Sequence, residues 1–254
     1  MPELPEVETV ASGVNARVRG RKIISVWTGS KPEPFKSTPA ELEHALTGSR
    51  IERVHRVGKH IVVDLVREDR EAIWRGQWLV HLGMTGRLLV SQAEVPLPLH
   101  THAVVQLDDD REIRFVDPRR FGRLAVLDFP NHSKTREDYA GSSEGKGFVG
   151  PGQEPLGITL DDFRKLFRGR RTPIKSALLN QSLLHGVGNI YADESLFRAG
   201  IRPRRQAARL RIREMTELRE ALQKVLNEAI ALGGSSVSDY VDADGVKGFF
   251  SVGA

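Results

Sequence analysis

The start of the chain places an amine next to a carboxylate. Proline follows the initiator methionine, and aminopeptidase processing usually exposes a residue this small. Processing would turn Pro2 into a secondary amine, and α-amino groups titrate near ~7.7 to 8.0 rather than at the ~10.4 of lysine. Such an amine can attack a sugar aldehyde carbon, and the resulting iminium is an electron sink for elimination. The alternative is that Met-Pro is a common start without chemical meaning.

Two glutamates follow this proline. Glu3 is adjacent to Pro2 and can move protons for the amine as a general acid or base. Glu6 lies one turn further on, where a carboxylate near a helix N-terminus is favourable without any catalytic role. The pattern therefore favours chemistry for Glu3 and a helix-start role for Glu6.

The composition excludes several other kinds of chemistry. The 254 residues contain no cysteine, which rules out a thiolate nucleophile, a disulfide framework, an iron–sulfur site and any cysteine-ligated zinc. No apolar run reaches the ~18 to 20 residues of a membrane span. The glutamate-rich start lacks the basic flank of a secretory signal, so we expect a cytoplasmic protein.

Two possible metal motifs are weak. His100 and His102 could share one face of a strand, but no third ligand lies near them in the sequence. The run Asp242-x-Asp244-Gly245 resembles a calcium loop, yet its later positions lack the required carboxylates. We therefore predict no metal site and no cofactor.

The charge is distributed unevenly. The chain carries 38 Lys and Arg against 33 Asp and Glu, with pI ≈ 9.6. Thirteen of the basic residues lie between Arg164 and Arg213, where Asp193 and Glu194 are the only acids. This concentration indicates a polyanionic partner such as nucleic acid, although a solvated helical surface would give the same pattern.

The pattern of apolar residues predicts an α+β protein with two domains. A helix is expected over residues 5–19, and Gly20 would end it. Alternating and β-branched segments then predict an antiparallel meander or β-sandwich up to Phe129. These segments are KIISVWT, RIERVHRV, HIVVDLV, WLVHLGM, GRLLVS, HAVVQL, EIRFVD and RLAVLDF, with a turn at Asp108-Asp109-Asp110 between two of them.

The second half of the chain is expected to be helical. Residues 131–155 have no apolar periodicity and are interpreted as a linker, so that the domains span 1–130 and 156–254. The last part, 233–250, is expected to be a loop. Helices are predicted over 161–168, from Pro173 (capped by Thr172) to about Leu184, from Tyr191 to Arg198, and from about Leu210 to Gly233.

Eight short motifs run in order along nearly the whole chain. They are MPELPEVET at the N-terminus, VGKHI at 57–61, HLGMTGRL at 81–88, DPRRFGRL at 117–124, QEPLG at 153–157, TPIKSALLNQ at 172–181, GVGNIYADESLFRAGI at 186–201 and GGSSVSDYVDADG at 233–245. In content and spacing they resemble the bacterial formamidopyrimidine-DNA glycosylase family. One motif alone would be weak, but eight collinear ones make chance similarity implausible.

The resemblance implies roles for residues at the start of the chain and in the VGKHI motif. Pro2 would attack C1′ of a damaged nucleotide, Glu3 would be its acid–base partner, and Lys59 would donate to the phosphate side. The chemistry calls for these types: an amine for a Schiff base, a carboxylate to move protons and a cation near phosphate. Without the resemblance, Lys59 would be interpreted as an exposed lysine at a strand end.

The remaining motifs would then bind DNA. An enzyme that acts on a base must take it out of the stack, which calls for an apolar wedge and a group that satisfies the orphaned partner base. The resemblance implies that Met84, Arg119 and Phe121 fill the void, and that His81 and Arg120 contact or support the backbone. It also implies DNA contacts by Lys175, Asn189 and Tyr191 around a helix-two-turns-helix element, and a lesion-covering loop with Ser235, Ser236, Val237, Ser238 and Tyr240.

The expected function is base-excision repair of double-stranded damaged DNA in the bacterial cytoplasm, at the nucleoid, by a monomer. The resemblance implies a bifunctional glycosylase and AP lyase that removes oxidised purines through a Pro2 Schiff base and β,δ-elimination. Two alternatives stay open: an oxidised-pyrimidine glycosylase of the endonuclease VIII type, and a non-catalytic binder of damaged DNA. The family's C-terminal four-cysteine zinc finger has no counterpart in this cysteine-free sequence, which fits either a truncation or a zincless member.

Overall fold

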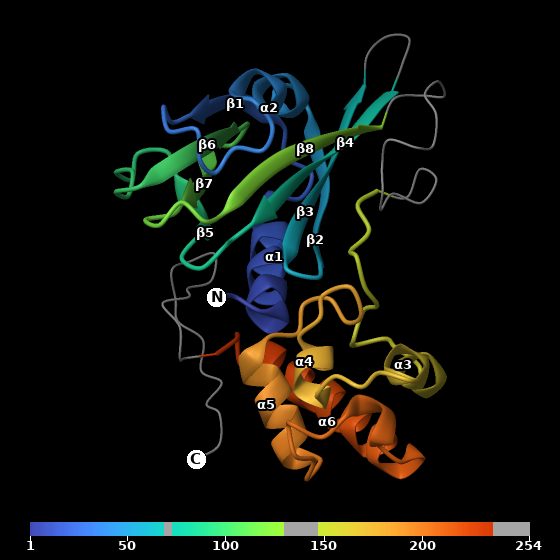
Figure 1. Cartoon of the computed structure of the whole chain (residues 1–254). Coiled ribbons are helices and arrows are strands. Elements are labelled where there is room, and N and C mark those ends of the chain that lie inside the picture. Colours follow the sequence, from blue (N-terminus) through green and yellow to red (C-terminus); the bar gives the residue numbers. More distant parts are fainter. Residues whose placement is uncertain (69–72, 130–146, 236–254) are drawn as a thin grey trace.

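The structure is a computed structural model of the chain and describes residues 1–68, 73–129 and 147–235. Two hydrophobic cores organise it, one within the β-rich N-terminal part and one within the helical C-terminal part. The predicted α+β class is confirmed (Figure 1).

The chain opens with helix α1 (Leu4–Val18), whose start is fixed by its own side chains. Glu3 is the N-cap, Pro5 lies in the first turn, and the backbone N–H of Glu3 donates to the carboxylate of Glu6 at 2.8 Å. Valines and alanine at helical spacing point into the first core. Leu4, at the other end of the apolar stripe, belongs to the second core, so α1 joins the two domains.

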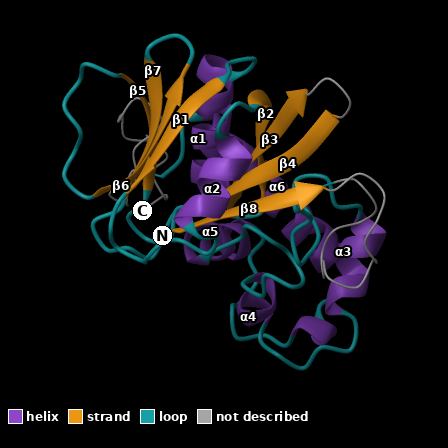
Figure 2. Ribbon diagram, turned by 90° about the horizontal axis from the view of Figure 1, so that it is seen from above, coloured by secondary structure: helices purple, strands orange, loops and turns teal. Residues whose placement is uncertain are grey.

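Within the described residues, eight antiparallel strands form two four-stranded sheets, and all eight sequence segments expected to be strands are confirmed. One sheet has the order β1-β6-β7-β5 and the other β2-β3-β4-β8. Helix α1 packs against strands of both sheets, and Figure 2 shows it between them. The strands are β1 (Ile23–Thr28), β2 (Arg50–Val57), β3 (His60–Glu68), β4 (Ile73–His81), β5 (Arg87–Gln92), β6 (Thr101–Leu107), β7 (Arg111–Val116) and β8 (Arg123–Phe129).

One helix of this domain was not expected from the apolar pattern. Helix α2 (Pro39–Leu46) lies against β1 and β8 and buries only three side chains, too few to stand out among strands. Its signal was the capping box: Thr38 accepts from the backbone of Glu41, whose carboxylate accepts from the backbone of Thr38.

The C-terminal part packs short helices around one long helix. The elements are α3 (Leu160–Phe167), α4 (Ile174–Leu178), α5 (Asn189–Arg198), the 3-10 turn η1 (Ala207–Arg209) and α6 (Ile212–Ala231). The expected helix from Pro173 to about Leu184 is wrong in its second half, because α4 ends at Leu178. Beyond it, the amide of Gln181 hydrogen-bonds the backbone of Leu179, Gly186 and Val187, which stabilises a loop in place of further helical turns.

Candidate active site

The N-terminus lies where the two domains meet. Met1 is half exposed, whereas Pro2 and Glu3 are buried. The backbone N–H of Leu4 donates to the carbonyl of Gly186 at 3.0 Å, which fastens the first residues of α1 to the loop before α5. The N label in Figure 1 lies just above the helical domain. The residues with the expected amine and carboxylate chemistry are thus placed between the two cores.

Glu3 is held in a close backbone pocket. Its Oε1 accepts from the backbone N–H of Ile190 at 3.3 Å, while Oε2 is buried without a hydrogen-bond partner among the described residues. A Cβ on Gly188 would lie 2.2 Å from the carboxyl carbon of Glu3, so any larger residue at this position would displace the carboxyl. Burial raises the pKa of Glu3 to about 7, against the opposing influence of Lys59. Near neutral pH this carboxyl can therefore both give and take a proton.

Lys59 reaches the site from the tip of the β2–β3 hairpin. Val57 pairs with His60, so Gly58 and Lys59 form a two-residue turn, and Gly58 takes φ +61° as such turns require at their first central position. Lys59 is half-buried, and desolvation lowers its pKa while the charges of Glu3 and Glu6 oppose that change. The structure thus brings Pro2, Glu3 and Lys59 together from two distant stretches of sequence.

Glu6 links three elements, which its sequence position alone did not indicate. Its expected role at the helix start is confirmed by the capping box with Glu3. In addition, Oε1 accepts from the hydroxyl of Tyr191 at 2.5 Å and from the backbone N–H of Ser235 at 2.7 Å. The carboxylate therefore connects α1 with α5 and with the segment that follows α6.

Two other expected DNA contacts differ from their sequence interpretation. The side chain of Tyr191 is fully buried and its hydroxyl donates to Glu6, so the predicted DNA contact of this residue, which remains a prediction, would have to involve its backbone. Ser235 is also buried, and its backbone bond to Glu6 marks the start of the expected substrate loop. The further loop residues, Ser236, Val237, Ser238 and Tyr240, lie outside the described residues.

Asp117 organises two neighbouring turns and was not singled out from the sequence. It is fully buried, and its Oδ1 accepts from the Thr85 hydroxyl at 2.6 Å and the Arg119 backbone at 3.3 Å. Its Oδ2 accepts from the backbone of Gly122 at 2.8 Å. One carboxylate thereby fixes the turn after β4 to the turn after β7. An aspartate in front of a proline turn was the available signal.

These two turns present side chains to solvent. Met84 is 43% exposed, Phe121 is 52% exposed, and the Arg119 guanidinium carbon lies 4.9 Å from the centroid of the Phe121 ring. The alternative that Phe121 is a core residue is wrong. A half-exposed phenylalanine forgoes part of the roughly 1.5 to 3 kcal/mol that full burial would give, and two such apolar side chains on adjacent turns are typical of a binding surface.

His81 and Arg120 lie beside the same turns. His81 Nδ1 accepts from the backbone of Gly83 at 3.1 Å, and its ring lies 4.9 Å from that of His60. Desolvation lowers the pKa of His81 to about 4, so the imidazole is neutral at pH 7 and supports the turn. Arg120 takes φ +57° and pairs with Glu33 at 3.3 Å on the exposed side.

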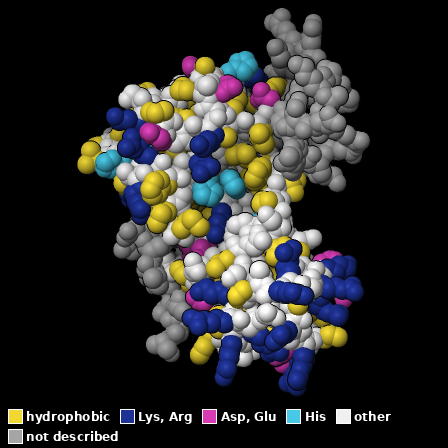
Figure 3. Space-filling model, in the orientation of Figure 1, with side chains coloured by type: hydrophobic (Ala, Val, Ile, Leu, Met, Phe, Trp, Pro, Cys, Tyr) yellow, Lys and Arg dark blue, Asp and Glu magenta, His cyan; other side chains and the backbone are white. Residues whose placement is uncertain are grey.

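The helical domain carries much of the positive surface charge, as Figure 3 shows. Asn189 is exposed at the first position of α5, directly after the Gly188 N-cap, where backbone N–H groups favour anions. Lys175 pairs with Asp193 at 2.8 Å. Arg171, Arg202 and Arg204 are exposed and have no acidic partner within the described part of the chain.

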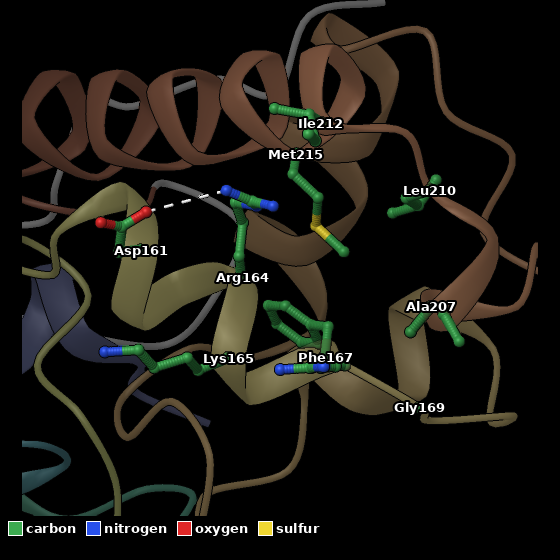
Figure 4. A pocket seen from close by; sticks show the side chains of 11 residues that line it. Asp161, Arg164, Lys165, Phe167, Gly169, Ala207, Leu210, Ile212 and Met215 are labelled. Atoms are coloured by element: carbon green, nitrogen blue, oxygen red, sulfur yellow. Dashed lines mark ion pairs between the residues drawn. The ribbon is translucent and has the colours of Figure 1, made fainter.

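A hollow elsewhere on the helical domain contains none of these site residues. It measures about 540 Å³ and lies between α3 and the start of α6, where Arg164, Phe167 and Met215 line it (Figure 4). Lys165 and Arg168 belong to the same lining. Within the described residues there is no group of three or more histidine or acidic side chains that could hold a metal ion. A helix long and apolar enough to cross a membrane is likewise absent from that part of the chain.

Comparison with known proteins gives one consistent result. Residues 1–124 match the formamidopyrimidine-DNA glycosylase N-terminal domain, and residues 151–241 match the formamidopyrimidine-DNA glycosylase H2TH domain. The formamidopyrimidine-DNA glycosylase of Gluconobacter oxydans is 42% identical over 256 residues, covering 98% of this chain and 85% of the relative. That of Herpetosiphon aurantiacus is 40% identical, with the same shares of each chain covered.

Solved structures agree with the sequence relatives. A Lactococcus lactis Fpg mutant in complex with DNA containing Fapy-dG is similar with a TM-score of 0.80 at 29% identity, covering 98% of this chain and 85% of that one. A complex of the Lactococcus lactis protein with DNA containing an abasic site has a TM-score of 0.79 at 29% identity, covering 97% and 84%.

Proposed function

The chain belongs to the formamidopyrimidine-DNA glycosylase family, and on that premise we propose that it removes oxidised purines, 8-oxoguanine and formamidopyrimidines, from double-stranded DNA and then cleaves the abasic strand. The observation that carries the proposal is the meeting of Pro2, Glu3 and Lys59 at one point between the domains, with the pKa of Glu3 raised to about 7. A non-catalytic DNA binder has no need of a buried carboxyl that titrates near neutral pH.

The proposed reaction begins at the amine of Pro2, once Met1 is removed. Its lone pair attacks C1′ while the bond from C1′ to the base nitrogen breaks, and the departing base takes up the proton that the Pro2 nitrogen releases. Glu3, which is half protonated near pH 7, donates to the opening sugar and gives an iminium between Pro2 and C1′. The Glu3 carboxylate then takes a C2′ proton, which expels the 3′ phosphate from C3′, and loss of the C4′ proton to solvent expels the 5′ phosphate from C5′. Lys59 offers its cation to that phosphate side.

The choice of purine lesions rests on the family, and one comparison favours testing a second class. A structural relative from Lactococcus lactis, 28% identical with a TM-score of 0.77, is described in complex with DNA that contains an oxidised pyrimidine. Oxidised pyrimidines therefore belong beside 8-oxoguanine in any assay of this chain.

The proposed reaction uses only an amine, a carboxyl and an ammonium group, so it needs no cofactor. We also propose that the protein is a monomer and acts at the bacterial nucleoid. The four-cysteine zinc finger implied by the family does not fit the residues of this sequence, which has no cysteine. No step of the reaction is assigned to it.

Covalent trapping tests the proposal directly. With 8-oxoguanine opposite cytosine and borohydride, the protein should form a stable one-to-one adduct with the DNA strand, because reduction fixes the iminium. Denaturing electrophoresis and mass spectrometry of the adduct measure this, with undamaged duplex as the control. Tight binding of the lesion duplex with no adduct would instead identify a non-catalytic binder.

Arg119 is expected to recognise the base left opposite the lesion. A bidentate arginine discriminates between bases by ~1 to 3 kcal/mol. Arg119→Ala should therefore flatten the preference for cytosine opposite 8-oxoguanine and leave the melting temperature nearly unchanged, because the side chain is exposed. Phe121→Ala should slow excision opposite all four bases, since the wedge is lost.

Single-turnover excision opposite each base, together with thermal melting, checks both variants. Arg120→Ala is the matched control on the same turn, and it should weaken binding about equally for every opposite base. An Arg119→Ala protein that retains its opposite-base preference would show that this side chain does not recognise the base.

A further inference from the structure

The loop of residues 185–189 touches the site at three successive points. A Cβ on Gly186 would lie 2.9 Å from Cβ of Leu4, and one on Gly188 would lie 2.2 Å from the carboxyl carbon of Glu3. The third contact is made by His185, against the turn that carries Lys59. Gly186 and Gly188 thus explain how the loop approaches the amine and carboxyl, but not what His185 contributes.

His185 is wedged between two glycines from different parts of the chain. The residue is 6% exposed, and a Cβ on Gly58 would lie 3.0 Å from its Nδ1. A Cβ on Gly150 would lie only 1.8 Å from the same atom. The imidazole therefore occupies space that any other residue at position 150 would fill, and it rests against the backbone next to Lys59.

Glu154 lies on the other side of the ring. His185 Nε2 is 3.3 Å from Oε2 of Glu154, but neither ring nitrogen makes a hydrogen bond among the described residues, so the ring is held mainly by packing. Glu154 also accepts two bonds from the guanidinium of Arg56, at 3.0 and 2.9 Å. Arg56 in turn donates to the carbonyl of Gly58 at 3.3 Å and to Glu8 on α1 at 2.8 Å. Both neighbours of Glu154 therefore contact the turn that presents Lys59.

We propose that His185 is a positioning residue for Lys59: wedged between Gly58 and Gly150 beside Glu154, its ring sets where the β2–β3 turn stands relative to Glu3. The inference rests on the proposed function. A lysine side chain is a flexible stem, so the place of its ammonium group depends on where the backbone of its turn is fixed. A displacement of about 1 Å at a reacting centre can cost ~10²-fold in rate.

Removal of the ring should lower the rate without weakening DNA binding. We expect His185→Ala to reduce the maximal single-turnover excision rate by about 10-fold or more. The Kd for a duplex with a tetrahydrofuran abasic analogue should stay within about twofold of that of the unmodified protein, because the His185 side chain is buried and is not available to contact DNA. His185→Phe, which keeps a ring of similar shape, should recover most of the rate. His44→Ala, on the exposed face of α2, is the matched control and should change neither quantity.

The pH profile separates positioning from simple packing. The groups that face Glu3 are Lys59, Glu6 and the backbone N–H groups of Ile190 and Tyr191, and Lys59 lowers the pKa of Glu3. If His185→Ala lets Lys59 move away, the limb of the pH–rate profile that depends on Glu3 should shift to higher pH. If the substitution only loosened the packing and left Lys59 in place, the excision rate would fall by the same factor at every pH.

Gly150→Ala provides an independent route to the same ring. Its Cβ would displace the imidazole, so the variant should be slow in the presence of His185 and cause little further loss in a His185→Ala background. All variants are compared at a temperature where circular dichroism shows them folded. Additive effects of the two changes, an unshifted pH profile, or a rise in Kd parallel to the loss of rate would overturn the inference. Absence of excision and trapping by the unmodified protein would instead overturn the proposed function.

Discussion

A protein that retains Met1 is expected to form no borohydride-trapped adduct with lesion DNA. In that protein the nitrogen of Pro2 is an amide, which has no basic lone pair to attack C1′. The free amine is then that of Met1, whose Cα lies ~3.8 Å from the Cα of Pro2. Met1 is half exposed, whereas Pro2 and Glu3 are buried, so the displaced amine also leaves the carboxyl that serves it.

The loss should exceed that of any single DNA-contact variant, because nucleophilic catalysis depends on this one atom. Trapped adduct per hour at saturating protein is the measurement, and the state of the N-terminus is verified by mass spectrometry. Affinity for the abasic-analogue duplex should change little, since the binding turns and the basic surface are untouched.

Pro2→Gly is the matched variant, because processing leaves glycine with a primary amine at the same place. It should trap more slowly than the unmodified protein and much faster than the protein that retains Met1. Full trapping by a protein with Met1 in place would mean that a different amine, such as Lys59, forms the imine.

Much of the fold and the Pro2-Glu3 pair could be predicted from the sequence, because both depend on residues that are close together along the chain. Alternating apolar residues determined all eight strands, and the Pro2-Glu3 pair was visible as adjacent chemistry. Helix α2 was missed because it buries a single short stripe between strands. The length of α4 was overestimated because the loop after it is stabilised by Gln181, whose three backbone partners cannot be inferred from apolar periodicity.

The supporting residues of the site could not be found in this way. Asp117, Glu6 and His185 act through partners that are distant in sequence: Thr85, Ser235 and Gly58 respectively. Such contacts exist only once the chain has folded and brought these segments together. The burial of the Tyr191 side chain could not be predicted for the same reason, since nothing in its neighbourhood along the chain shows that its hydroxyl donates to Glu6.

Glu3→Gln is expected to give an inactive but more stable protein. A glutamine cannot transfer the proton, and loss of a general acid–base group typically costs ~10² to 10⁴ in rate. The amide keeps the size of the carboxyl and can still accept from the backbone of Ile190, so the packing against Gly188 should persist. Single-turnover excision and trapping at pH 7 measure the loss.

The gain in stability follows from the pKa of Glu3. Burial raises it from 4.5 to about 7 in the folded protein, so the folded state binds the proton more tightly than the unfolded state does. The protonated carboxyl therefore stabilises the fold fully below pH ~4.5, and this contribution is lost as pH rises through 7. By pH 8 the ionised, buried carboxylate costs on the order of 3 kcal/mol of unfolding free energy, which glutamine avoids.

Urea unfolding at several pH values between 5 and 8 tests the direction of this pH dependence of stability. The stability of Glu3→Gln relative to the unmodified protein should increase steadily with pH over that range. Glu41→Gln is the control, because hydrogen bonds from Thr38 lower the pKa of Glu41 and favour its ionised form in the folded state, so this variant should be less stable than the unmodified protein by an amount that does not change between pH 5 and 8. If Glu3→Gln were instead less stable at pH 8 than the unmodified protein, Glu3 would be ionised and satisfied in the fold. It could not then supply the proton that the proposed reaction requires of it.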